Sequence, residues 1–180
     1  MIIVLLHVAL ANAVGLRRID GFQAVVKSVA DIAQNQWVFY SGDYNGIFAY
    51  YLRAEDQTFS LGVVRSSKLL YVTLIDKRFG LHENVSSRAD VLDALRKGCG
   101  CRYLLVEREL PQGIVAERYL RDALRSEEFR LLRTFPVETP TAHHVDLYEF
   151  LGAIEQLDEY EVAFPELGKG IRYRIRPIQR

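Results

Sequence analysis

The amino-acid sequence predicts an α/β fold: a three-layer, Rossmann-like, mostly parallel sheet with a C-terminal antiparallel β extension. Helix-spaced apolar residues alternate with short apolar runs between residues 20 and 137, as in successive βαβ units. After Pro140 the helical spacing disappears and strand-like stretches follow. We therefore expect an apolar segment (1–17), an α/β core (18–140) and a β extension of the same domain (141–180).

The sequence of the first half of the core predicts two helices and two strands. Residues 21–34 carry apolar side chains at three- and four-residue spacing after Asp20, a good helix-capping residue, and so predict a helix. The apolar run QWVFYSG that follows predicts a buried strand, and a strongly aromatic helix comes after it. FSLGVVR (59–65) predicts the second strand, whereas the pattern of SSKLLYVTLI leaves its conformation open.

The second half continues the alternation. Ser87 and Asp90 form a capping box at a helix start, and Gly98 stands where that helix should end. RYLLVE predicts a strand, residues 114–126 a helix, and RLLRTFPV another strand. In the extension we expect strands at HVDLYEFL, EYEVAFPE and GIRYRIRPI, with the last two joined through residues 165–170.

Composition excludes some classes of function. The 180 residues, 49% of them hydrophobic, are enough for one core. The 23 basic and 23 acidic residues give a formal net charge of zero, so we do not expect a nucleic-acid-binding protein, which normally carries a basic excess. Cys99 and Cys101 are two residues apart, a spacing that strains a disulfide, so no disulfide framework is expected.

Residues 1–16, MIIVLLHVALANAVGL, are almost wholly apolar and allow several interpretations. The segment is shorter than the roughly 20 apolar residues of a membrane span. It resembles the apolar region of a secretory signal with an Ala-x-Ala site at residues 11–13, but a basic N-terminal region is missing. The remaining interpretations are the end of a membrane helix that begins outside this chain, and a buried helix or strand.

A candidate binding turn, SGDYNG (41–46), follows the first strand. Ligands of parallel α/β sheets bind at the carboxyl ends of the strands, where the N–H groups of a helix start can meet an anion. The spacing of Gly42 and Gly46 is not the dinucleotide fingerprint, and no Walker lysine follows. The alternative is that both glycines satisfy turn geometry while Asp43 or Asn45 caps the next helix.

The residues selected as a candidate ligand-binding set are Asp43, Asn45, Arg53, Arg65 and Lys68. The three cations could converge on a phosphate, which arginine binds through two parallel hydrogen bonds. The alternative is that they are surface charges that pair with Glu55 or Asp56.

Two other groupings do not predict a site. His143 and His144 would face opposite sides of a strand, so together with Asp146 they do not form a metal site. Ser41, His144 and Asp146 lack the Gly-x-Ser-x-Gly elbow of a hydrolase. No cofactor, metal or catalytic residue is therefore expected. The alternating arginines at 172, 174 and 176 suit lipid headgroups or an acidic partner, or else form the solvated face of an edge strand.

Several segments, in their order, resemble the soluble extracytoplasmic C-terminal domain of bacterial protein-mannosyltransferase-like membrane glycosyltransferases, which include the lipid-A aminoarabinose transferase relatives. These segments are IDGFQAVVKSVADI, VFYSGDYNGIFAYYLRA, VVRSSKLLYV, CRYLLVE, LLRTFPV, VDLYEFLG and FPELGKGIRYRI. The resemblance runs from about residue 18 to the end and is strongest at residues 41–53 and 65–70.

In that family, acidic residues of a loop in the membrane part act on a polyprenyl-phosphate-linked sugar. This chain has no such loop, so no catalytic residue can be transferred to it. The resemblance implies a non-catalytic accessory domain on the periplasmic side of the membrane, in a truncated or detached copy, with residues 1–16 as the end of a membrane helix. Its partners would be the membrane-embedded glycosyltransferase part and a glycan or polyprenyl-phosphate-sugar acceptor.

Two alternatives remain open. The chain could be a free-standing small α/β protein that binds a nucleotide or sugar phosphate in the same crevice. It could instead be a protein-interaction module that uses the basic last strand. If the N-terminal segment is a buried element, the expected location is cytoplasmic.

Overall fold

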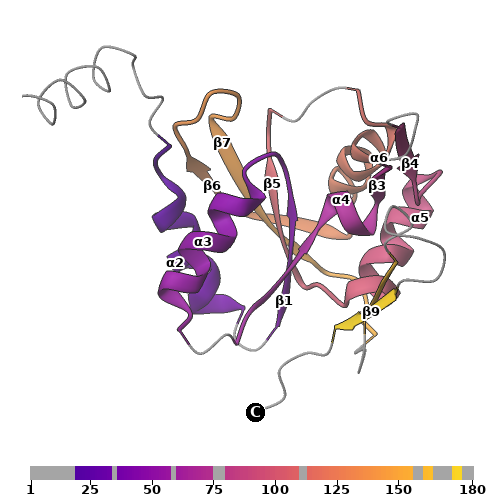
Figure 1. Ribbon diagram of the computed structural model, residues 1–180, viewed down its shortest axis with the longest axis horizontal. Helices are drawn as coiled ribbons and strands as arrows, with labels where there is room; N and C mark the ends of the chain where they lie inside the picture. The colour runs from indigo at the N-terminus through magenta and orange to yellow at the C-terminus, as the bar shows by residue number, and fades with distance from the viewer. Residues whose placement is uncertain are drawn as a thin grey trace, which may run out of the picture.

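The computed structural model describes residues 19–33, 36–57, 60–74, 80–109, 113–155, 160–163 and 172–175. Its centre is a five-stranded mixed sheet in the order β2-β1-β5-β7-β6 (Figure 1). In this order the strands are β2 (Gly62–Arg65), β1 (Trp37–Ser41), β5 (Tyr103–Glu107), β7 (His144–Phe150) and β6 (Phe129–Pro136). The predicted α/β class is confirmed at this level.

The sheet is mixed rather than mostly parallel as expected. β1 pairs in parallel with β2 and β5, whereas β7 pairs antiparallel with both β5 and β6. HVDLYEFL, expected in a C-terminal extension, therefore lies inside the main sheet as β7. The link of residues 137–143 between β6 and β7 is too short for a parallel crossover, so the chain returns antiparallel. Buried apolar side chains such as Val145 and Leu147 favour this interior position.

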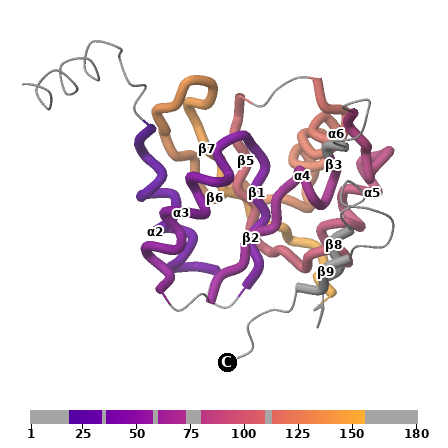
Figure 2. Tube along the Cα trace, in the orientation of Figure 1, coloured from indigo at the N-terminus to yellow at the C-terminus, as the bar shows by residue number. Residues whose placement is uncertain are grey.

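Helices pack against both faces of the sheet (Figure 2). Successive side chains of β1 point to opposite faces: Val38 and Tyr40 belong to one buried cluster, and Phe39 belongs to the other. The first cluster contains α2 (Phe22–Ile32) and α3 (Asn45–Glu55). The second contains α4 (Ser66–Leu69), α5 (Arg88–Asp93), the π-helical turn η1 (Ala94–Cys99) and α6 (Val115–Leu124).

Two small antiparallel pairs complete the described chain. β3 (Tyr71–Leu74) pairs with β4 (Gly80–Glu83), and β8 (Tyr160–Ala163) pairs with β9 (Arg172–Ile175). The strands predicted at EYEVAFPE and GIRYRIRPI are thus confirmed as a pair. The link at residues 165–170 and the side chains of the basic strand lie outside the described residues.

The start of α2 differs from the prediction. The helix begins at Phe22, its cap residue is Gly21 rather than Asp20, and the Asp20 carboxylate accepts a hydrogen bond from the adjacent Gly21 N–H at 2.8 Å. Gly21 has a φ of 89°, and a Cβ there would lie 2.6 Å from the carbonyl oxygen of Pro136. This close approach to the end of β6 explains why the chain turns at a glycine.

The start of α5 follows the prediction in part. The Ser87 hydroxyl accepts a hydrogen bond from the Asp90 N–H at 3.2 Å, as a capping box requires. The Asp90 carboxylate accepts hydrogen bonds from the N–H and hydroxyl of Ser86. Both interactions fix the N-terminus of α5 and lower the pKa of Asp90.

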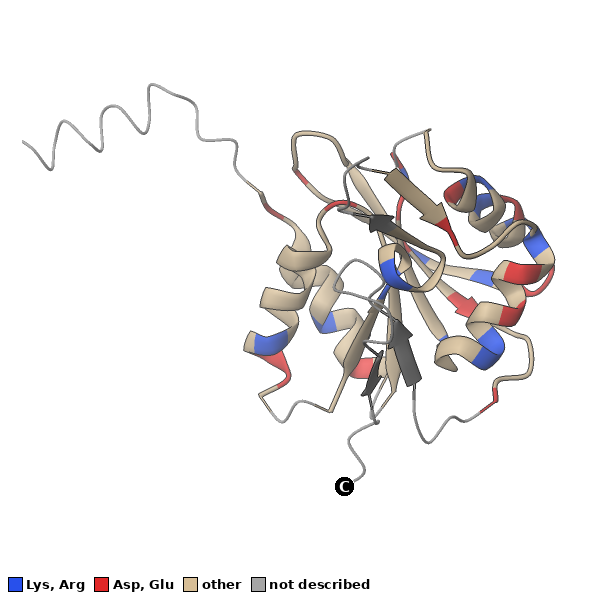
Figure 3. Ribbon diagram, turned by 45° about the vertical axis from the view of Figure 1, so that its right-hand side comes forward, with Lys and Arg blue, Asp and Glu red and all other residues tan. Residues whose placement is uncertain are grey.

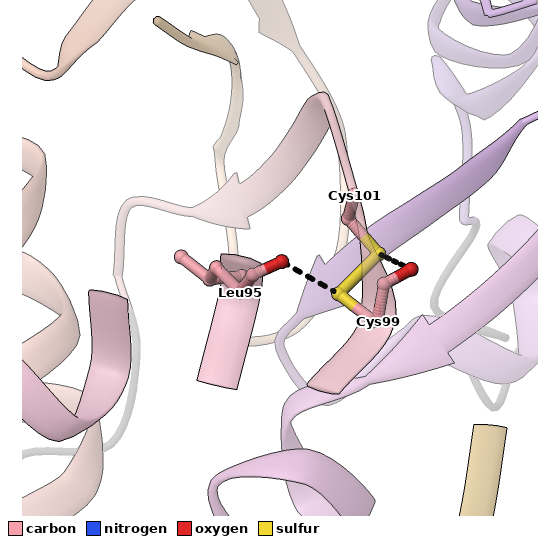
Figure 4. Close-up of a disulfide and its surroundings, with 3 residues drawn as sticks. All are labelled: Leu95, Cys99 and Cys101. Carbon is pink, nitrogen blue, oxygen red and sulfur yellow. Dashed lines mark hydrogen bonds between the residues drawn. A yellow bond between two sulfur atoms is a disulfide. The ribbon is translucent and has the colours of Figure 1, made fainter. Parts of the chain in front are cut away.

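The cysteine-containing segment corrects two expectations. The helix does not end at Gly98 but continues through η1 to Gly100, whose φ of 59° lies in the left-handed region. That turn brings the Cα atoms of Cys99 and Cys101 to 5.3 Å, within disulfide range, and the two sulfurs are bonded (Figure 4). The Sγ atom of Cys99 also lies 3.7 Å from the carbonyl oxygen of Leu95 (Figure 4).

The aromatic ring of Trp37 covers the edge strand β2. Trp37 on β1 stands opposite Gly62 on β2, and a Cβ on Gly62 would overlap the indole ring. The glycine therefore lets the ring lie directly over the edge strand.

The N-terminal apolar segment lies outside the described residues. Within the part of the chain that the structure describes, no helix has the length and apolar character needed to cross a bilayer.

Candidate functional site

The turn between β1 and α3 surrounds a carboxylate from the neighbouring strand. The Glu107 side chain accepts hydrogen bonds from the backbone N–H groups of Asp43 at 3.0 Å and Tyr44 at 2.8 Å. It also accepts one from the hydroxyl of Tyr40 at 2.7 Å. Gly42 has a φ of 149°, and a Cβ there would overlap the Glu107 carboxyl group. The amides that could receive an external anion therefore bind an anion of the chain itself.

Strand register explains why Glu107 reaches this turn. β1 and β5 run in parallel with Ser41 opposite Val106, so Glu107 is the next residue along β5 and stands beside the turn. The expected capping by Asp43 or Asn45 is not found. Tyr44 is the cap residue of α3, without a side-chain cap, and the Asn45 amide donates to the Gly42 carbonyl at 3.2 Å. Glu107 instead binds the amides of Asp43 and Tyr44, which directly precede the first helical residue, Asn45.

A second buried carboxylate lies close by on α6. The Ser41 hydroxyl donates to Glu117 Oε2 at 2.6 Å, and Glu117 is only 2% exposed. The hydroxyls of Ser66 and Tyr71 also face this carboxylate. Oε1 of Glu117 nevertheless accepts no well-formed hydrogen bond from any residue that the structure describes.

Burial controls the protonation of these groups. Desolvation raises the pKa of both Glu107 and Glu117, although the hydrogen bonds that each carboxylate accepts oppose the shift. Burial, followed by the charge of Glu107, also raises the pKa of Tyr40. Burial and the charge of Glu117 raise the pKa of Tyr71 to about 12. The cluster can therefore hold protons, and its carboxylates and Ser41 are almost completely buried.

Four of the five candidate binding residues lie near the carboxyl ends of β1 and β2, although α3 and α4 pack on opposite faces of the sheet. Asp43 and Asn45 lie in the turn or at the start of α3, Arg65 ends β2 opposite Tyr40, and Lys68 lies on α4 just beyond.

Arg53 lies near the other end of α3, away from these four residues. Its guanidinium donates to the Leu61 carbonyl at 2.8 Å and to the Asp56 carboxylate at 3.4 Å. Arg53 thus pairs with Asp56 as the alternative expected, but the Asp56 side chain is only 5% exposed, so this is not a pair of surface charges.

The residues of the excluded triad have separate partners. Ser41 binds Glu117, His144 Nδ1 lies 2.9 Å from Glu109 Oε1, and Asp146 binds Arg108. Among the described residues, no three His, Cys, Asp or Glu side chains gather as metal ligands would.

A solvent-facing pocket of about 320 Å³ lies next to this cluster. Its wall combines arginines, two carboxylates and apolar side chains: Val106, Glu107, Arg108, Arg121, Leu124, Arg125, Leu131, Asp146 and Tyr148. Sequence reasoning missed this pocket because it is assembled from β5, α6, β6 and β7. Two signals were available: Arg108 directly follows a buried strand, and Arg121 and Arg125 are one turn apart on a predicted helix.

Sequence reasoning also missed Glu107 and Glu117. Glu107 ends the apolar run RYLLVE, and an acidic residue at the end of a buried strand was the available signal. For residues 114–126 the spacing predicts that Val115, Tyr119 and Ala123 face the core. Ala123 is buried, but the other buried positions of α6 are Ala116, Glu117 and Leu120.

Comparison with known proteins identifies no relative: no family model matches the chain, and no curated protein or solved structure is significantly similar to it.

Proposed function

We propose that this chain is a non-catalytic, extracytoplasmic accessory domain of a polyprenyl-phosphate-sugar-dependent glycosyltransferase-like membrane protein. The segments quoted above support the choice of family. We further propose that its helices and mixed sheet are a variant of a three-layer Rossmann-like architecture. The observation that carries the non-catalytic part is the Glu107 carboxylate bound in the turn after β1.

This observation favours an accessory domain over a free-standing nucleotide- or sugar-phosphate-binding protein. Phosphate binding at this edge would use the N–H groups of Asp43 and Tyr44, which already donate to Glu107. An incoming phosphate would have to displace that carboxylate and break its bond with Tyr40, or else lie beside a like charge. Both alternatives oppose binding.

A thermal-shift experiment tests the non-catalytic part. Nucleotides and sugar phosphates that rely on the β1–α3 turn should leave the melting temperature of the full chain unchanged. Stabilisation by one of them, accompanied by amide shifts at Asp43 and Tyr44 in an NMR titration, would contradict the proposal. Shifts confined to other residues would indicate a different site.

Membrane fractionation tests the accessory part. The full chain, expressed in a bacterium, should sediment with the membranes and resist extraction by alkaline carbonate. A Leu5→Lys, Val8→Lys variant should move to the supernatant, because charges in the apolar segment oppose its insertion. A supernatant location of the unsubstituted chain, together with genomic DNA upstream of Met1 that encodes no apolar segments, would overturn this part.

A further inference from the structure

The pocket beside α6 combines fixed positive charge with an apolar wall. Arg108 follows β5, Arg121 lies on α6 and Arg125 is the residue that caps its C-terminus; Leu131 and Tyr148 come from β6 and β7. Its volume of about 320 Å³ lies at the lower end of the range of small-molecule sites. Figure 3 shows that basic and acidic positions alternate over the helices on this side of the molecule.

Arg108 is held in place by the chain itself. Its Nε and Nη2 atoms donate to the two oxygens of Asp146 at 3.0 and 2.6 Å, and Nη2 also donates to the Thr134 hydroxyl at 3.0 Å. The Arg108 side chain is nevertheless 48% exposed. Among the described residues no acceptor meets Nη1, so two N–H donors of a pre-oriented guanidinium remain for a ligand.

Arg121 and Arg125 add charge on the same wall because residues four apart on a helix are neighbours. Arg125 pairs with Asp122 at 3.3 Å, but both side chains are mostly exposed, so water weakens this pair.

The two acidic groups of the wall are already bound. Asp146 accepts two hydrogen bonds from Arg108, and Glu107 accepts hydrogen bonds from Tyr40 and the turn amides. The three arginines of the wall outnumber these two carboxylates, and Nη1 of Arg108 keeps two N–H donors that can meet an external anion.

The apolar part of the wall favours a ligand that carries an apolar group beside its anionic group. Leu131 is 50% exposed, and Leu124 and the ring of Tyr148 are partly exposed. A ligand that covered these side chains would gain by removing apolar surface from water.

We propose that this pocket binds a small organic anion: a carboxylate or phosphate monoester joined to an aromatic or aliphatic body. The anionic group would face the three arginines, and the body would lie against Leu131 and Tyr148. This proposal does not rest on the function proposed above.

An NMR titration of the ¹⁵N-labelled full chain tests this site. The probes are phenyl phosphate, benzoate, inorganic phosphate and benzyl alcohol. We expect phenyl phosphate or benzoate to shift the amide signals of the pocket residues, and the tighter of the two identifies the preferred anionic group. Inorganic phosphate and benzyl alcohol each lack one half of the ligand and should bind at least about tenfold more weakly.

Substitutions in the wall of the pocket test whether the probe binds there. Arg121→Gln combined with Arg125→Gln should weaken the tighter probe by about tenfold or more. The control, Arg118→Gln, removes an exposed arginine of the same helix that does not line the pocket, and it should change affinity less than twofold. Leu131→Asp adds a negative charge at a half-exposed position and should also abolish tight binding without disturbing the core.

Three results would overturn the proposal. The first is that no probe shifts the pocket amides at millimolar concentration. The second is that inorganic phosphate binds as tightly as phenyl phosphate and benzoate. The third is that the double arginine variant binds like the unsubstituted chain, or that Arg118→Gln loses as much affinity. Circular dichroism of each variant separates a binding effect from loss of the fold.

Discussion

Two adjoining regions at the carboxyl end of β5 differ in whether their anion-binding groups are already occupied by the chain itself. In the turn after β1, backbone amides that could bind an external anion hold the Glu107 carboxylate. In the pocket beside α6, arginines outnumber carboxylates, and the carboxylates are already bound. Backbone geometry alone therefore does not reveal a ligand site. A side chain of the protein occupies the anion-binding amides of the first region, and only the second region is open to a ligand.

The largest expected effect is that of Gly42→Ala. The new Cβ would overlap the Glu107 carboxyl group at a φ of 149°, which side chains rarely adopt. Overpacking and backbone strain together predict a loss of about 4 kcal/mol in the free energy of unfolding. Urea unfolding measures this loss of stability.

The matched control is Gly46→Ala in α3, where no atom lies within 4 Å of the new Cβ. It should leave stability unchanged or raise it by about 0.5 kcal/mol. Similar losses in both variants would refute the tight fit of Glu107.

Glu107→Ala should cost about 3 kcal/mol because it leaves Tyr40 and two turn amides without their acceptor. The same change should open the turn to an external anion. Acetate at several times its dissociation constant should then restore about 1 kcal/mol of the variant's stability. The unsubstituted chain provides the control, since it should not respond to acetate. If acetate stabilised both proteins equally, the turn would not be the site of rescue.

Glu117→Gln should stabilise the protein by about 1 kcal/mol at pH 7, because it removes the cost of burying a carboxyl group that is ionised in the unfolded chain and keeps the shape of the side chain. Folding raises the pKa of Glu117 above its ordinary value of 4.5. The folded state therefore favours the protonated form, and the contribution of Glu117 to stability is greatest below its unfolded pKa and decreases as the pH rises through its folded pKa.

The advantage of Glu117→Gln should accordingly shrink when the pH is lowered from 7 toward the unfolded pKa. Urea unfolding of both proteins across this range measures the difference. An advantage that grows on acidification would mean that the pKa of Glu117 is lowered by folding.

Arg53→Ala should have the smallest effect, a loss of about 1 kcal/mol, because the Arg53 side chain is 36% exposed and the buried Asp56 carboxylate still accepts hydrogen bonds from the Ser60 hydroxyl and the Leu61 N–H. Since Arg53 lies away from both regions, its removal should not alter the binding of phenyl phosphate or benzoate in the NMR titration. A change in probe affinity would place Arg53 in a binding site after all.

Local sequence patterns predicted the elements better than their assembly. The apolar run at β1 and the hydroxyl of Ser87 as a helix cap were predictable because their causes lie within a few residues. The antiparallel insertion of β7 was not, since the burial of Val145 and Leu147 in the core formed with α2 and α3 decides its place. The occupant of the β1–α3 turn is 64 residues from Asp43 in sequence, so no local motif points to it.

The contact of Trp37 with Gly62 has a practical consequence for following this protein in solution. Trp37 is the single tryptophan of the chain, and its ring covers the edge strand β2. Its fluorescence is therefore a site-specific signal for the docking of that strand. If the emission changed before the circular dichroism during unfolding, β2 would detach ahead of the rest of the sheet.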